Sequence, residues 1–376
     1  MWKISSVLAG IVLVLLALGI VMLASTSGVR GEFSTGDPGY YVKRQFVWLV
    51  VALIVGFVVA VLDYRIWRRL AFPLAAGAIV LLAAVLVVGP EINGSQRWIR
   101  VGALSIQPSE IAKLAVVLML SAWMTHVGPH AARFKEGLLF PLLGLGLICG
   151  LILWEPDYGT TALIAAAALT MMFVGGSRPG HLLIVGTVGV CVMSLAIMQD
   201  AERSERILAF LNPEANRDAA FQVIEAKNAF VLGGPFGVGL GNSSQKHFYL
   251  PEAHTDFILP IIGEELGSVT CVIVLLFLGI LYCGMIVSER APDQFGRFLA
   301  FGATIMLTLQ ASINVGVVTG LLPTKGLPLP FISYGGSSLV ISLIFVGLVL
   351  SVARKSADGP RGDRSGAAIK DRAHRI

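Results

Sequence analysis

The sequence predicts an all-α polytopic membrane protein, and three observations indicate this fold class. Hydrophobic residues make up 56% of the 376 residues and charged residues only 14%, whereas a soluble chain would carry about a quarter charged residues. The mean hydropathy is +0.80. Apolar runs of the length that crosses a bilayer, about 20 residues, recur along nearly the whole chain.

The apolar runs define about ten predicted transmembrane helices. They span residues 7–26, 46–63, 70–88, 110–127, 138–153, 160–174, 181–198, 257–287, 297–318 and 333–353. Because the first run is long enough to span and many others follow it, we interpret it as a retained helix and not as a cleaved signal. The eighth is long enough to tilt or break, and Pro260 near its start suits either a first turn or a kink.

The basic residues orient the predicted bundle. An even number of spans puts both termini on one side, and Lys and Arg are concentrated in the short segments of that side. Such segments are typically cytoplasmic, so both termini are predicted to be cytoplasmic and the large loop between the seventh and eighth helices, residues 199–256, to be extracytoplasmic. We predict one transmembrane domain, residues 1–353, and a disordered, basic cytoplasmic tail, residues 354–376. The net charge of +5 follows this topology and does not indicate nucleic-acid binding.

The first unusual outer segment is GPEINGSQRWIRVGALSIQPSEIAKLAVV, residues 89–117. It is polar and then enters a helix at Pro108, with Glu110 and Lys113 three residues apart on one helix face. The two form either an ion pair that neutralises itself or part of a cavity wall, since ionisable residues in spans usually face a cavity. We favour the wall.

A second outer segment, WEPDYGTTA at residues 154–162, connects two spans. Glu155 and Asp157 flank Pro156 in it. Two interpretations stay open. A tight acidic turn needs no function, and an acidic residue at a helix start suits the helix dipole, but Asp157 could also join a polar cavity.

The third outer segment is YLPEAHTDFILPIIGEELG, residues 249–267, preceded by the glycine-rich stretch GGPFGVGLGNSSQKHFY. No strand precedes the glycines, which excludes a dinucleotide-binding fingerprint, and we expect them to let an irregular loop lie against the bundle. The segment brings several ionisable side chains to one helix entrance: Glu252, His254, Asp256, Glu264 and Glu265. Because carboxylates are costly at membranes, we interpret this cluster as the mouth of a functional site.

The fourth outer segment, GLLPTKGLPLPFISYGGSSL at residues 320–339, cannot be one continuous helix, because three prolines interrupt it. A non-helical stretch at membrane depth is tolerated only against protein or a wet cavity. Lys325 lies in its middle, and the small residues from Gly335 to Ser338 permit close packing of the last helix.

Together the four segments predict an outward-opening polar cavity with charges of both signs. Its candidate cationic residues are Arg97, Lys113, Lys246, His254 and Lys325. Its candidate carboxylates are Glu110, Asp157, Asp256 and Glu264. A mixed site of this kind suits an anionic substrate that must also give up a proton.

The motifs NGSQRWI…QPSEIAKL, EPDYGT, GLGNSSQKHFYLPEAHTDFI…GEELG and GLLPTKGLPLPFISYGGSSL resemble the SEDS family (shape, elongation, division and sporulation) over about residues 7–353. The late motifs are most similar to its cell-division branch. The resemblance implies a peptidoglycan glycosyltransferase that polymerises lipid II at the outer face of the cytoplasmic (inner) membrane, at the division septum. It also implies a class B penicillin-binding protein transpeptidase and other division proteins as partners. By position it makes Asp256 the essential acid and matches Arg97 and Lys113 to the family motifs.

The chemistry of such a transfer agrees with these positions. A sugar 4-hydroxyl attacks the anomeric carbon of a lipid-diphosphate sugar with inversion, giving a β-1,4 link, and the diphosphate leaves as an anion, so one base suffices. Asp256 is the candidate base, whereas Glu264 and Glu265 are expected to support the pocket. Arg97, Lys113 and the other lysines would hold the diphosphate.

Metal binding is not indicated by the sequence. The four cysteines lie in apolar runs without paired spacing, and no metal-ligand motif is present. A divalent cation, Mg²⁺ or Mn²⁺, could still share the neutralisation of the diphosphate.

Alternative functions remain at this point. They are a rod-elongation polymerase of the same family, a lipid II flippase and a non-catalytic division scaffold. In the eighth span, the partner's helix is expected to pack on Gly279 and Gly284, and its extracellular part on the 199–256 loop.

Overall fold

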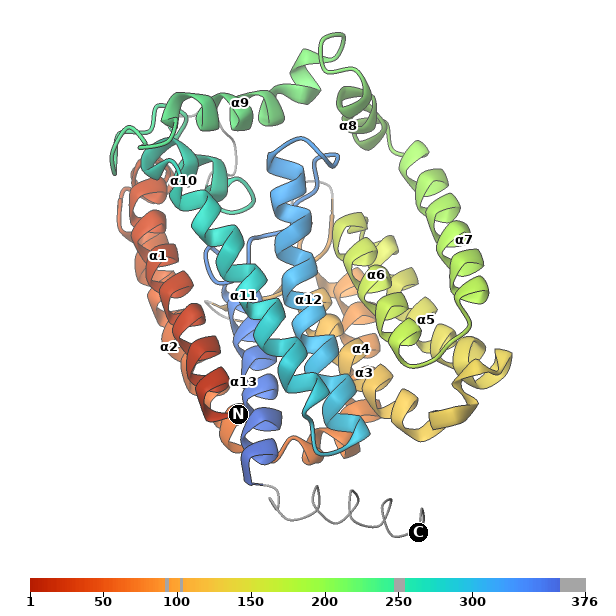
Figure 1. Cartoon of the computed structure of the whole chain (residues 1–376). Helices are drawn as coiled ribbons and strands as arrows, with labels where there is room; N and C mark the ends of the chain where they lie inside the picture. Colours follow the sequence, from red (N-terminus) through yellow and green to blue (C-terminus); the bar gives the residue numbers. More distant parts are fainter. Residues whose placement is uncertain (92–94, 102–103, 247–253, 359–376) are drawn as a thin grey trace, which may run out of the picture.

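The computed structural model describes residues 1–91, 95–101, 104–246 and 254–358, and these form a helical bundle with an outer cap (Figure 1). Glu252 and the tail from 359 onward lie outside the described residues. The bundle helices are α1 (Trp2–Thr35), α2 (Tyr40–Val61), α3 (Arg65–Val88), α4 (Pro108–Val127), α5 (Phe140–Trp154), α6 (Tyr158–Val174), α7 (Pro179–Met198), α11 (Val269–Glu289), α12 (Gln294–Val318) and α13 (Gly336–Asp358).

The remaining elements lie in the connections. They are the hairpin β1 (Ile99–Val101) and β2 (Leu104–Ile106), a 3₁₀ turn (Gly128–Ala132), a π turn (Lys135–Leu139), α8 (Ala201–Leu211), α9 (Arg217–Gly233) and α10 (Ile258–Leu266). In the described residues, nine helices are long and apolar enough to cross a membrane, and the shorter apolar α6 occupies the remaining predicted span, residues 160–174. The predicted fold class is confirmed.

The eighth predicted span, residues 257–287, consists of two helices, α10 and α11, with a break at residues 267–268. Gly267 at the break has φ +59°, and a Cβ there would lie 2.6 Å from the backbone of Pro235 and Gly237. Ser268 N donates to the Pro235 carbonyl at 3.0 Å. Close packing of the preceding loop therefore sets the break, and Pro260 lies in the first turn of α10.

The centre of the bundle is formed by α4, α12 and α13. In the apolar segment of each of these three helices, 72% of the residues are buried. In α7, which stands apart from the bundle in Figure 1, only 11% are buried. Helices that contact protein on most sides can carry polar groups, and Lys113, Gln310 and Asn314 are buried there. α7 instead exposes apolar side chains along its length.

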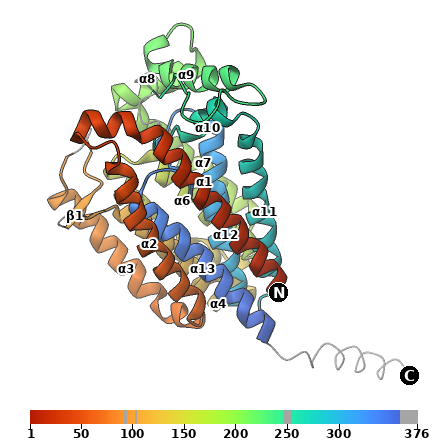
Figure 2. The same ribbon diagram turned by 90° about the vertical axis from the view of Figure 1, so that its left-hand side faces the viewer.

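The two ends of the bundle differ. α1 begins and α13 ends at one end, whereas α8, α9 and α10 cover the other (Figures 1 and 2). At the first end, Tyr64 Oη donates to Asp293 Oδ2 at 2.6 Å and Lys355 pairs with Asp63 at 3.2 Å. These contacts join the α2–α3 connection to the α11–α12 connection and to the end of α13. This agrees with the predicted topology, in which both termini share one side.

The two glycines of α11 on which a partner helix was expected to pack contact this chain's own helices. Gly284 is buried, and a Cβ there would lie 2.0 Å from Thr304 Oγ1 of α12. A Cβ at Gly279 would lie 2.9 Å from Ile11 Cδ1 of α1. Both glycines therefore allow close helix packing within the bundle.

Candidate functional site

A cavity of about 290 Å³ lies beside Asp256 at the outer end. Five parts of the chain meet around it: α2, the β hairpin with its flanks, the start of α6, the segment just before α10, and the irregular stretch between α12 and α13 with the first turn of α13. Its lining residues are Arg44, Trp48, Arg97, Trp98, Ser105, Gln107, Asp157, Thr255, Asp256, Gly326, Pro328 and Tyr334 to Ser338. Three of the predicted site residues, Arg97, Asp157 and Asp256, are brought together here.

The backbone at Asp256 is held by hydrogen bonds to α12 and to the proline-rich stretch. Asn314 Nδ2 donates to the Asp256 carbonyl at 2.9 Å and to the Leu327 carbonyl at 2.8 Å. Tyr334 N donates to the His254 carbonyl at 3.0 Å. A Cβ on Gly326 would lie 2.9 Å from Asp256 Oδ2. The half-buried carboxyl therefore packs directly over a glycine, at the wall of the cavity.

His254 belongs to an aromatic cluster and does not line this cavity. It is buried, with its ring centroid 4.9 Å from that of Tyr41 and 5.8 Å from that of Tyr334. Because Tyr334 does line the cavity, His254 supports its wall from behind.

Glu264 holds the glycine-rich loop and lies outside the cavity. Its carboxylate accepts from Ser243 Oγ, from Ser244 N at 2.9 Å and from Ser244 Oγ at 2.8 Å. A buried carboxylate with several donors is a fixed anchor. The predicted supporting role of Glu264 agrees with this geometry, and the loop lies against α10 as expected from its glycines.

Lys246 is anchored in the same way, through Glu265. Its Nζ lies 3.1 Å from Glu265 Oε1, with both side chains buried, and also donates to the Gly241 carbonyl. Glu265 in turn accepts from Ser25 Oγ of α1 at 2.8 Å. Lys246 therefore ties the loop to α10 and does not line the Asp256 cavity.

Glu110 and Lys113 form a buried ion pair within α4, beside Gln310 of α12. Lys113 Nζ lies 2.8 Å from Glu110 Oε2 and 2.8 Å from Gln310 Oε1. The side chains are only 2% and 4% exposed. Of the two interpretations of these residues, the geometry favours the ion pair, because neither residue lines the Asp256 cavity.

Asp157 caps α6 and also reaches the cavity. Its carboxylate accepts from Thr160 N at 3.2 Å and from Thr160 Oγ1 at 2.8 Å, which satisfies the N-terminus of the helix. Gln107 Nε2 donates to it at 3.4 Å. Both interpretations of the acidic turn therefore hold at once.

Arg97 is fixed on the same turn. Its Nε donates to the Glu155 carbonyl at 3.1 Å and its Nη2 to the Pro156 carbonyl at 2.6 Å. Glu155 itself is fully buried and neither carboxyl oxygen has a hydrogen-bond partner. Burial, with a smaller contribution from Asp157, raises the pKa of Glu155 to about 8. This carboxyl is therefore largely protonated at neutral pH.

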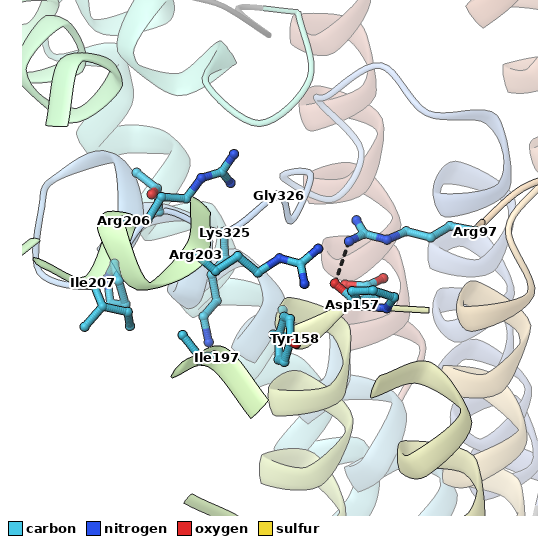
Figure 3. Close-up of a pocket in the computed structure, with 13 residues that line it drawn as sticks. Arg97, Asp157, Tyr158, Ile197, Arg203, Arg206, Ile207, Lys325 and Gly326 are labelled. Atoms are coloured by element: carbon cyan, nitrogen blue, oxygen red, sulfur yellow. Dashed lines mark hydrogen bonds between the residues drawn. The ribbon is translucent and has the colours of Figure 1, made fainter. Parts of the chain in front are cut away.

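Lys325 lines a second, smaller cavity of about 90 Å³ that shares Arg97, Asp157 and Gly326 with the first (Figure 3). Burial lowers the pKa of Lys325, and the charge of Asp157 partly opposes that shift. Two arginines of α8, Arg203 and Arg206, also line this cavity.

Several lining residues were missed by the sequence interpretation. Trp48 lies in an apolar run with nothing in the sequence to mark it, but a Cβ on Gly336 would lie 2.2 Å from its ring, so it packs against α13. Arg44, Trp98 and Tyr334 also line the larger cavity. Arg203 is one of several basic residues in the 199–256 loop. Its spacing of three residues from Arg206 was the available signal.

The residues do not fit a cation held by the protein alone. Among the described residues, no three His, Cys, Asp or Glu side chains group as metal ligands. We therefore assign no step to Mg²⁺ or Mn²⁺.

Comparison with known proteins gives a consistent result. The family described as "Cell cycle protein" (FtsW/RodA/SpoVE) matches residues 6–358. A probable peptidoglycan glycosyltransferase FtsW of Trichlorobacter lovleyi is 40% identical over 351 residues, covering 92% of this chain and 92% of that protein. Stage V sporulation protein E of Bacillus subtilis is 40% identical over 351 residues, covering 92% and 96%.

Solved structures agree in fold over nearly the whole chain. A chain from a peptidoglycan synthase complex that coordinates polymerization and crosslinking has a TM-score of 0.75 and 30% identity, covering 96% of this chain and 99% of that one. The rod shape determining protein RodA of Thermus thermophilus has a TM-score of 0.70 and 30% identity, covering 95% and 97%. The predicted resemblance and enzyme class are confirmed, and the chain belongs to the SEDS family of FtsW, RodA and SpoVE proteins.

Proposed function

We propose that this peptidoglycan glycosyltransferase polymerises lipid II into β-1,4-linked glycan at the outer face of the cytoplasmic membrane during septal wall synthesis. The observation that carries the proposal is the Asp256 carboxyl at the wall of a cavity that also holds two arginines and three aromatic rings. Aromatic lining with a few polar groups is typical of a site that binds an organic ligand.

Asp256 acts as the general base in this proposal. The 4-hydroxyl of the acceptor sugar attacks the anomeric carbon of the lipid-linked sugar, its proton passes to the Asp256 carboxylate, and the carbon–oxygen bond to the diphosphate breaks with both electrons going to that oxygen. The backbone bonds from Asn314 and the contact with Gly326 keep the base in place.

Charge neutralisation falls to residues that line the cavities. Arg97 and Lys325 are the predicted cations that do so, and Asp157 holds the turn beside them. Direct contact of substrate with Lys113, Glu110, Lys246, His254 or Glu264 stays a prediction. Their contacts within the chain favour a supporting role.

The septal role is favoured over rod elongation by the relatives. FtsW proteins are 40% identical to this chain, whereas the RodA structure is 30% identical. Against a flippase, the charges that line these two cavities gather at the outer end of the described bundle. We further propose a class B penicillin-binding protein as partner, together with other division proteins. The similarity to a chain of a synthase complex supports the transpeptidase partner.

The test is polymerisation of lipid II by the purified chain with its cognate transpeptidase, read as glycan length on gels. Asp256→Asn keeps the size of the side chain but cannot accept the proton, so we expect at least ~100-fold less polymer. Asp218→Asn, an exposed carboxylate on α9, is the matched control and should polymerise normally. Polymer of normal length and rate from Asp256→Asn would remove the proposed base.

A further inference from the structure

The small cavity beside the Asp256 cavity has a composition of its own. Four basic side chains, Arg97, Arg203, Arg206 and Lys325, and one carboxylate, Asp157, line it. The larger cavity carries Asp256, three aromatic rings and only two basic side chains, Arg44 and Arg97, whereas Tyr158 is the aromatic residue among those that line the smaller one. The two therefore differ in chemistry although they share a wall: one is compact and basic, the other roomier and aromatic.

The arginines of the basic cavity come from α8, outside the transmembrane bundle. Asp200 caps α8 and also pairs with Arg203, Nη1 to Oδ2, at 2.7 Å. The guanidinium of Arg203 lies 4.7 Å from the centre of the Tyr158 ring at the start of α6. This contact fixes α8 over the start of α6 (Figure 3). Arg206, one turn further along α8, lines the same cavity.

Two basic groups of this cavity, Arg97 and Lys325, have charges that carboxylates compensate only in part. Arg97 donates its two hydrogen bonds, from Nε and Nη2, to backbone carbonyls. Burial lowers the pKa of Lys325, and such a desolvated ammonium group gains from an anion close by. Guanidinium groups bind phosphate oxygens with strong, often bidentate hydrogen bonds. A compact anion with several oxygens is the ligand that this lining fits.

The opposite side of the basic cavity is apolar. Ile197 at the end of α7 and Ile207 of α8 line it. α7 is the least buried of the candidate spans and exposes apolar side chains along its length. A ligand with an anionic head and a hydrocarbon tail could therefore place its head among the arginines while its tail stays beside α7.

We propose that the basic cavity binds the diphosphate of the lipid-linked donor, with Arg203 and Arg206 of α8 as ligands beside Lys325. The proposal rests on the proposed function and divides the site in two. The donor sugar crosses the shared wall of Arg97, Asp157 and Gly326 into the larger cavity, where the acceptor meets Asp256. The bond that breaks, between the anomeric carbon and the diphosphate oxygen, then lies at the shared wall. The departing diphosphate is held in the basic cavity, away from the Asp256 carboxylate.

The test uses undecaprenyl diphosphate, which carries no sugar, so its binding does not depend on transfer. Its Kd is measured for the full chain in nanodiscs, with undecaprenyl monophosphate as the comparison ligand. Replacement of both arginines, Arg203→Gln with Arg206→Gln, should weaken diphosphate binding at least ~10-fold and monophosphate binding less. Arg217→Gln removes an exposed charge of the same loop outside the cavity and should leave the Kd unchanged.

Two results would overturn the proposal. One is an unchanged Kd for the diphosphate in the double variant. The other is an equal loss for both ligands, which would indicate a general surface charge effect. If the double variant does not fold, Arg206→Gln alone, which keeps the Arg203 contacts with Asp200 and Tyr158, decides by the same criterion. Asp256→Asn should bind the diphosphate normally, so failure of the base and failure of this subsite are distinguishable.

Discussion

Replacing Lys113 by methionine tests whether the Glu110–Lys113 pair supports the fold or contacts substrate. The Lys113 ammonium lies 2.8 Å from Glu110 Oε2 and from Gln310 Oε1, with 2% of its side chain exposed. Lys113→Met leaves a carboxylate uncompensated in the core, which costs about 3–5 kcal/mol. We expect the thermal midpoint to fall by roughly 5–15 °C. Adding Glu110→Gln removes the buried charge and should restore most of the loss.

The assay compares unfolding in detergent with lipid II turnover per folded molecule, for both single variants and the double variant. A supporting role predicts strong coupling between the two positions in stability and near-normal turnover in the double variant. A stable Lys113→Met protein that fails to bind lipid II would refute this reasoning. It would return Lys113 to the group of substrate-binding cations.

Two further predictions concern the neighbourhood of the base. Gly326→Ala places a Cβ 2.9 Å from Asp256 Oδ2 and should displace this carboxyl, lowering polymerisation ~10–100-fold without a loss of stability. Gly150→Ala in α5, whose Cβ would meet nothing within 4 Å, is the control. Equal activity of the two variants would contradict the placement of Asp256. Glu155, with its pKa raised from 4.5 to about 8, contributes stability at low pH that is lost as pH rises through about 8. Glu155→Gln should therefore be more stable than the natural chain at pH 8–9 but not near pH 4, as thermal unfolding across this range would detect, and parallel stability curves would refute the raised pKa.

The spans and their ends were predictable because their signals are local. The lengths of the apolar runs, Pro108 at a helix start and the prolines after Gly320 each act on their own segment of chain. The predicted starts and ends agree with the helices to within several residues, apart from α1, which extends to Thr35. The break at Gly267 was placed less well, because it depends on the loop near Gly237, thirty residues away in sequence.

The cavity was predictable in kind but not in all its members. Arg97, Asp157 and Asp256 were predicted to meet, and they do. The sequence does not distinguish a charged residue that lines the cavity from one that is paired elsewhere. Lys113 pairs with Glu110, and Lys246 pairs with Glu265. Such partners are fixed only by tertiary packing.

The aromatic and α8 contributions could not be predicted for a related reason. Trp48 reads as one more apolar residue of a span, and its role depends on the close approach of Gly336. Arg203 reaches the site only because α8 folds back over the start of α6. Neither contact can be predicted from the residue pattern of the segment in which Trp48 or Arg203 lies.

The central claim is that Asp256 is the base of the transfer, and single-turnover polymerisation tests it most directly. The purified chain with its cognate transpeptidase is loaded with lipid II, bound substrate is measured, and the first transfer is then followed for the natural chain and for Asp256→Asn. We predict equal binding and a transfer step at least ~100-fold slower in the variant. Equal transfer rates with equal binding would contradict the account.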